Sequence, residues 1–156
     1  MRSMMAAMII LATGSAAADD FSGTGRLWFT LAAMPLQATG SAGQAKGMER
    51  FPREAVALRD LRSECFGWAD GAGLGKGHCI NTAPNGDLWI ETYECGTAVP
   101  PPAGAFAACK GHTRVLGGTG QFAAMAGSGE ILMLTTMIAP DGMQVVYAPA
   151  DYDLHW

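Results

Sequence analysis

The chain has 156 residues, enough for one domain, and 49% of them are hydrophobic while 15% are charged. This balance excludes a disordered tail, and the formal net charge of −4 disfavours a nucleic-acid binder, which normally carries a basic face. No apolar run reaches the ~18 residues that a membrane-spanning helix needs, so we expect no membrane span.

Residues 1–18 have the layout of a secretory signal peptide. Arg2 precedes the apolar run Met4–Ala12, and small residues follow up to Ala18. We predict cleavage after Ala18, which leaves 19–156 as a single domain in the periplasm or outside the cell. Removal of Arg2 takes away one of ten basic and none of fourteen acidic side chains, so the net charge falls from −4 to −5.

All four cysteines lie in the predicted exported domain. An even number of cysteines in a small exported domain is typical of disulfides, so we predict two bridges. Four cysteines allow three pairings, and the sequence leaves the choice among them open. The chain contains no C-x2-C or H-x3-H spacing, so we expect no metal site, and no motif calls for a cofactor. The four are Cys65, Cys79, Cys95 and Cys109.

The first half of the domain contains one clear strand. Arg26–Leu31 alternates polar or amphipathic residues with apolar ones, which predicts a strand with one apolar face. Thr39–Gly47 is small and polar, and we interpret it as a loop. Residues 48–64 fit a helical stripe or a strand, and we favour a strand over Ala55–Arg62 because of its β-rich surroundings.

The middle of the domain contains a hairpin signal. Gly67–Gly77 holds five glycines, and we expect turn or loop there. His78–Thr82 and Leu88–Cys95 are β-favouring runs on either side of Asn85-Gly86, a dipeptide typical of a tight hairpin turn.

The last third continues the same pattern of short strands and turns. A proline-rich loop, 96–104, precedes the run Phe106–Leu116, and Pro140-Asp141-Gly142 marks a further hairpin turn. The remaining runs are Glu130–Ile138, Met143–Ala148 and Tyr152–Trp156. Seven or eight strands at this spacing predict an all-β sandwich or barrel.

The run Val115–Gly129, which reads VLGGTGQFAAMAGSG, resembles the GGTG segment of the allene oxide cyclase and dirigent protein superfamily. The stretch from Cys65 to Asp87 is also similar to small exported bacterial members of that group. The resemblance implies a small antiparallel eight-stranded (calycin-like) β-barrel. Ala124 stands where the family pattern has glycine. The family's functional residues match no positions here, so the resemblance carries over the fold and not the reaction.

The glycines of this run also have a physical interpretation. They let the chain make a tight turn between two strands, and Phe122 after them would plug apolar space. No lysine follows in the P-loop position, and no helix pattern follows either, so we expect a barrel turn rather than a phosphate-binding loop.

Trp89, Glu91 and Tyr93 share one face of a predicted strand. If that face points into a barrel, two aromatic side chains flank a carboxylate in a ligand-binding pocket. In the other arrangement, Leu88 and Ile90 point inward, and the face that carries Trp89, Glu91 and Tyr93 is exposed to solvent or forms a subunit contact. We favour this second arrangement, and we treat Trp28 on the first strand in the same way.

The sequence therefore predicts an exported, non-catalytic β-barrel that binds a small hydrophobic molecule or an envelope protein partner, or serves a structural role. The alternative is a cyclase-like or dirigent-like protein that guides a reactive intermediate without a cofactor. In that case Glu91 is the best available catalytic carboxylate. Neither hypothesis excludes a homo-oligomer, and neither requires nucleic acid.

Overall fold

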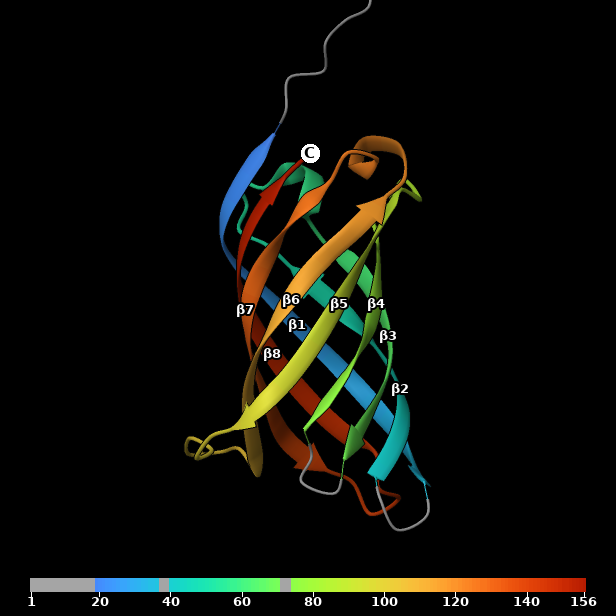
Figure 1. The fold of residues 1–156 in the computed structure, drawn as a ribbon, viewed down its shortest axis with the longest axis vertical. Coiled ribbons are helices and arrows are strands. Elements are labelled where there is room, and N and C mark those ends of the chain that lie inside the picture. The colour runs from blue at the N-terminus through green and yellow to red at the C-terminus, as the bar shows by residue number, and fades with distance from the viewer. Residues whose placement is uncertain (1–18, 37–39, 71–73) are drawn as a thin grey trace, which may run out of the picture.

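The computed structural model describes residues 19–36, 40–70 and 74–156, and these form a closed barrel of eight antiparallel strands. Each strand pairs with the next one in the chain, and the last strand returns to pair with the first (Figure 1). This confirms the predicted all-β, eight-stranded antiparallel barrel. The predicted signal peptide, 1–18, lies outside the described residues.

The strands are long and their connections are short. Two 3-10 turns, η2 (Val56–Leu58) and η3 (Gly120–Phe122), interrupt the connections at one end of the barrel. The strands are β1 (Asp20–Leu36), β2 (Gly40–Arg50), β3 (Leu61–Asp70), β4 (Gly75–Thr82), β5 (Leu88–Ala98), β6 (Ala107–Gly118), β7 (Ala126–Ile138) and β8 (Gln144–His155).

Alternation along each strand builds the core, because successive side chains point to opposite faces of a sheet. In β1, Leu27 and Phe29 are buried inside the barrel while Trp28 is 43% exposed on the outer wall. β8 shows the same alternation over its whole length, and its buried residues are Val146, Ala148, Ala150, Tyr152 and Leu154.

Large side chains fill the end of the barrel that carries η2 and η3, the upper end in Figure 1. Trp89 and Phe122 are fully buried there, with their ring centroids 5.8 Å apart, and the ring of Phe51 lies 5.9 Å from that of Trp89. The prediction that Phe122 plugs apolar space is confirmed. We call Phe51, Leu58, Trp89 and Phe122 the plug.

Both disulfides join neighbouring strands. Cys65 on β3 is bonded to Cys79 on β4, its direct cross-strand partner, and Cys95 on β5 is bonded to Cys109 on β6. The two predicted bridges are confirmed, and both are the local pairs. Each closes a loop with a sequence separation of 14.

Three predictions of local structure are wrong. Residues 40–47, interpreted as loop, belong to β2, where small residues allow close contact with β1. A β-carbon on Gly47 would overlap the backbone of Trp28 and Phe29. The strand expected over Ala55–Arg62 is instead η2 and an irregular segment. Leu58 there enters the plug, and β3 begins only at Leu61.

The third error concerns Gly67–Gly77, expected as turn or loop. Most of this stretch is strand, since β3 continues to Asp70 and β4 begins at Gly75. The predicted hairpin turn after β4 is confirmed: Gly86 has a φ of 91°, and Ala83 N–H donates to the carbonyl of Asp87 at 2.8 Å.

Candidate functional site

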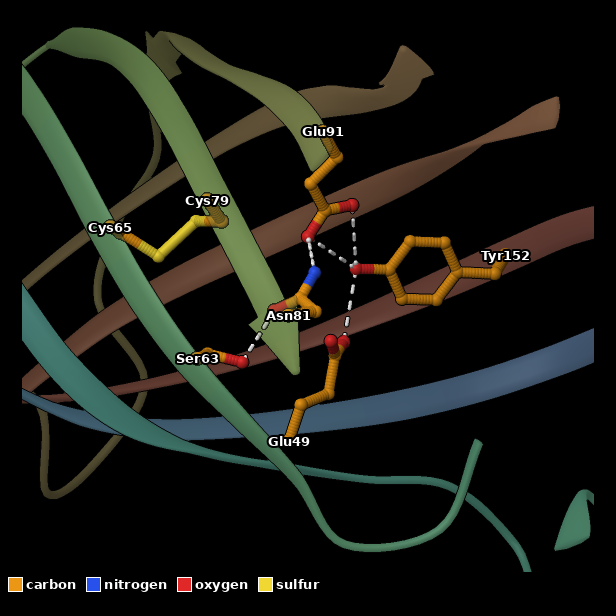
Figure 2. The surroundings of a disulfide bond; sticks show 7 residues. All are labelled: Glu49, Ser63, Cys65, Cys79, Asn81, Glu91 and Tyr152. Atoms are coloured by element: carbon orange, nitrogen blue, oxygen red, sulfur yellow. Dashed lines mark hydrogen bonds between the residues drawn. A yellow bond between two sulfur atoms is a disulfide. The ribbon is translucent and has the colours of Figure 1, made fainter. Parts of the chain in front are cut away.

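Two buried carboxyl groups meet one tyrosine inside the barrel. Tyr152 Oη on β8 lies 3.0 Å from Glu49 Oε1 on β2, and 3.2 Å and 3.3 Å from the two carboxyl oxygens of Glu91 on β5 (Figure 2). Glu49 is 1% exposed and Glu91 is 2% exposed. A phenol has one proton, so it can donate to only one carboxylate. The other contact is a hydrogen bond when that carboxyl is protonated.

An amide and a hydroxyl extend this cluster. Asn81 Nδ2 on β4 donates to Glu91 Oε1 at 3.0 Å, and Ser63 Oγ on β3 donates to Asn81 Oδ1 at 2.5 Å. Both residues are buried, and both the oxygen and the nitrogen of the Asn81 amide are hydrogen-bonded. These two bonds fix the orientation of the amide. Figure 2 shows the chain of contacts from Ser63 to Glu49 beside the Cys65–Cys79 bridge.

Burial makes these acids retain their protons. Loss of solvation raises the pKa of Glu91 from 4.5 to about 7, although the hydrogen bonds from Asn81 and Tyr152 oppose the rise. Burial, followed by the nearby charge of Glu91, raises the pKa of Glu49 well above its usual value. Burial and the two carboxylates also raise the pKa of Tyr152. The cluster therefore holds at least one exchangeable proton near neutral pH.

A small hollow adjoins the cluster on the side away from the plug. It measures about 30 Å³, room for about two water molecules. Glu91, Thr113 and Tyr152 supply its polar lining, and Tyr93 and the first disulfide also reach it. The apolar lining comes from β1, β2, β7 and β8, namely Leu27, Phe29, Leu31, Gly43, Ala45, Ile131, Met133 and Ala148.

A second hollow of about 80 Å³ continues toward the other end of the barrel, the lower end in Figure 1. The two hollows share four lining residues, Leu31, Gly43, Tyr93 and Met133. The second also reaches Cys95 and Cys109, so each disulfide lies against interior space. We call the two hollows together the shaft.

Three buried side-chain atoms in the described residues lack a hydrogen-bond partner: Thr113 Oγ1, Glu49 Oε2 and Trp89 Nε1. Thr113 lies near enough to Glu91 to help lower the pKa of that carboxyl, yet its hydroxyl makes no hydrogen bond of standard geometry. Unpaired buried polar atoms are costly, so each of these is a place where a water molecule or a ligand atom would be stabilised.

The predicted site residues all point inward. This overturns the arrangement that we favoured from sequence, with Leu88 and Ile90 inside, because Trp89 and Glu91 are buried and Tyr93 lines the shaft. The three do not share one pocket: Glu91 and Tyr93 line the shaft, whereas Trp89 packs into the plug. For Trp28, the favoured outward placement is confirmed.

Sequence reasoning missed Glu49, Asn81, Thr113 and Tyr152. Glu49 lies in a polar stretch without visible alternation, and Tyr152 alternates with the small residues Ala148 and Ala150. Only the closure of the barrel brings β2, β5 and β8 around one point, so no local pattern could join these residues.

No protein-family model and no curated protein matches the chain. Within the described residues, no group of three or more histidine, cysteine or acidic side chains is placed to hold a metal ion. In the same part of the chain, no helix has the length and apolar character needed to cross a membrane.

Proposed function

We propose that the protein is an exported, non-catalytic barrel that binds a small, mainly apolar molecule in the shaft. The apolar part of the ligand lies against Leu31 and Met133, and its polar end reaches Glu91, Thr113 and Tyr152. The observation that carries the proposal is the hydroxyl of Thr113, which lines an apolar hollow beside Glu91 and makes no hydrogen bond of standard geometry. Ligand sites combine apolar walls with a few polar groups that fix orientation in this way.

The size of the shaft limits what it can hold. The first hollow, of about 30 Å³, is far below the ~300 Å³ of a typical small-molecule site, so a ligand must be slender or must move side chains. Met133 lines both hollows and has three flexible bonds, which lets it change rotamer at low cost. A short unbranched chain fits this geometry better than a ring system.

Export is part of the same proposal. The predicted signal peptide and the two disulfides both favour an oxidising compartment, the periplasm or the medium. The resemblance around Val115–Gly129, together with the eight-stranded antiparallel barrel, supports placement in the allene oxide cyclase and dirigent superfamily.

The second candidate function is the cyclase-like or dirigent-like one, in which the barrel guides a reactive intermediate without a cofactor. The observation in its favour is the position of Glu91, which touches both Tyr152 and the hollow and has a pKa of about 7. A carboxyl group with this pKa gives up and accepts a proton readily at neutral pH, which suits general acid–base catalysis.

The test uses 1-octanol as a slender amphiphile with one hydroxyl. Residues 19–156 are produced in an oxidising compartment, and binding is measured by calorimetry for the wild type, Thr113→Val and Thr97→Val. We expect Thr113→Val to weaken binding about tenfold, the loss of one hydrogen bond to a buried group. Thr97 is exposed on β5, so Thr97→Val should bind as the wild type does. No binding at ~1 mM, or equal binding by both variants, overturns the proposal.

A reactive probe separates the two candidate functions. A short-chain vinyl epoxide is incubated with the wild type and with Glu91→Gln, and the products are analysed by chromatography. The binding function predicts that the epoxide is recovered as in buffer. Rearrangement by the wild type that Glu91→Gln abolishes would establish the cyclase-like function instead.

A further inference from the structure

A groove of about 550 Å³ crosses the outer wall of the barrel over β3, β4, β5 and β6, on the opposite side of the wall from the shaft. Its volume lies within the ~300–1,000 Å³ range of small-molecule sites. Its lining residues are Phe66, Gly67, Trp68, Lys76, Gly77, His78, Thr92, Tyr93, Glu94 and His112.

The strand register explains why a groove forms here. Phe66, His78 and Thr92 are cross-strand neighbours, and they form one outward row. Two residues further along the strands, Trp68, Lys76, Glu94 and His112 form a second outward row. The row between them points inward, so the floor of the groove between the two outward rows is backbone.

Two glycines lie in the strands that form the floor of the groove. The inward row contains Gly67 and Gly77, which are direct cross-strand partners, followed by Tyr93. Neither glycine has a side chain, and the phenol of Tyr93 covers both of them on the inner face of the wall. The floor of the groove is therefore formed by the backbone of β3, β4 and β5.

The two exposed aromatic side chains stand at the β3 end of the groove, and hydrogen-bonding side chains of β4, β5 and β6 line the rest of it. Trp68 is 49% exposed and Phe66 is 46% exposed at the β3 end. The ammonium group of Lys76 lies 5.6 Å from the centroid of the Trp68 ring, and His112 Nε2 lies 3.9 Å from Glu94 Oε2. Hydrogen-bond donors and acceptors of the groove therefore lie close to the exposed rings of Trp68 and Phe66.

We propose that this groove is a carbohydrate-binding site, in which sugar rings stack on Trp68 and Phe66 and sugar hydroxyls bond to Lys76, His78, Glu94 and His112. A pyranose ring has an apolar C–H face and a rim of hydroxyl groups. An exposed aromatic ring flanked by polar side chains matches both parts of that ring. The groove shares the wall residues Gly67, Trp68 and Tyr93 with the shaft but opens on the outer face of the barrel, and the proposal does not depend on the proposed function.

The same residues fit other partners less well. The core of a protein–protein interface is depleted in lysine and glutamate, whereas Lys76 and Glu94 stand side by side in the second row. Nucleic acid is disfavoured by the net charge of −4 and by the carboxylate of Glu94 within the groove.

Two exposed tryptophans provide a matched pair for the test. Trp68 lies in the groove, and Trp28 is 43% exposed elsewhere on the barrel wall, where it stacks on Tyr147 at 5.1 Å. Calorimetric titrations use three soluble oligosaccharides, cellohexaose, chitohexaose and an oligogalacturonate, with the wild type, Trp68→Ala and Trp28→Ala. Circular dichroism confirms that each variant is folded.

We expect at least one oligosaccharide to bind with a dissociation constant between about 10 μM and about 1 mM. Trp68→Ala should weaken this binding at least tenfold, and Trp28→Ala should change it less than twofold. Three results overturn the proposal: no oligosaccharide binds, Trp68→Ala binds as the wild type does, or Trp28→Ala loses binding equally.

Discussion

The phenol of Tyr93 lies against Gly67, so that one thin part of the barrel wall separates the shaft from the outer groove. A β-carbon on Gly67 would overlap both the Tyr93 hydroxyl and the carbonyl oxygen of Lys76. The absence of a side chain at this position is therefore a requirement of packing, because the φ of Gly67 is one that other residues adopt.

We expect Gly67→Ala to lower the free energy of unfolding by at least ~1–3 kcal/mol, the usual cost of overpacking. Gly96→Ala serves as the control, since only Glu94 Oε1, at 3.8 Å, lies near that position. Urea denaturation followed by circular dichroism measures both variants. Equal stability of the two would show that Tyr93 moves aside freely.

The buried carboxyl groups make stability depend on pH. Between pH ~4.5 and ~7 the folded protein keeps the proton of Glu91 while the unfolded chain loses it, so stability falls as pH rises through this window. The loss is at most about 3 kcal/mol for a shift of this size. Glu91→Gln should make the profile less steep, with the slope due to Glu49 remaining, whereas Glu130→Gln, at an exposed position, should leave it unchanged.

Urea titrations across that pH range measure the effect. A wild-type profile that is flat between pH 4.5 and 7, or one that rises, would contradict the protonated cluster. Adding Glu49→Gln to the Glu91→Gln variant should remove the remaining slope of stability against pH, because burial raises the pKa of Glu49 as well.

The plug should account for a large share of stability. Phe122 is fully buried against Trp89 and Trp156, and Phe122→Ala is expected to cost ~3–5 kcal/mol. Phe106 is 68% exposed, so Phe106→Ala should change stability by less than ~0.5 kcal/mol. Thermal unfolding of both variants tests this. A small effect of Phe122→Ala would mean that the upper end of the barrel collapses to fill the space.

The disulfides give a fourth prediction. Replacement of Cys95 and Cys109 by serine should lower the free energy of unfolding by about 3 kcal/mol, the chain-entropy value for a loop of about 15 residues. Peptide mapping without reductant should recover Cys65 linked to Cys79. Recovery of Cys65 linked to Cys95 would contradict the observed strand register.

The parts of the fold that the sequence predicts are those with strong local signals. Arg26–Leu31 alternates cleanly, and Asn85-Gly86 turns between two β-favouring runs; both lie where we expected them. β2 has no such signal, because its residues from Gly40 to Gly47 are small and polar. Pairing with strands on both sides holds it in the sheet.

The candidate site was predictable only in part, for a related reason. Glu91 and Tyr93 could be placed on one strand face, but the direction of that face depends on the register with β4 and β6. Glu49 and Tyr152 are separated by 103 residues, and they meet only because β8 closes against β1. Contacts between residues so far apart in the sequence depend on the topology of the barrel, and no local sequence pattern indicates them.

Closure also brings the two ends of the domain together. Asp19 N–H donates to the carbonyl of Trp156 at 2.7 Å, and Trp156 N–H donates to the carbonyl of Asp19 at 2.9 Å. The strands therefore form a closed ring, and the chain could begin at any of the tight turns without changing which strands are neighbours. A circular permutant, joined from Trp156 to Asp19 by a short glycine linker and opened at Asn85-Gly86, would keep every strand neighbour. A tag attached at Trp156 would stand beside the plug, and it would leave the far end of the shaft and the outer groove uncovered.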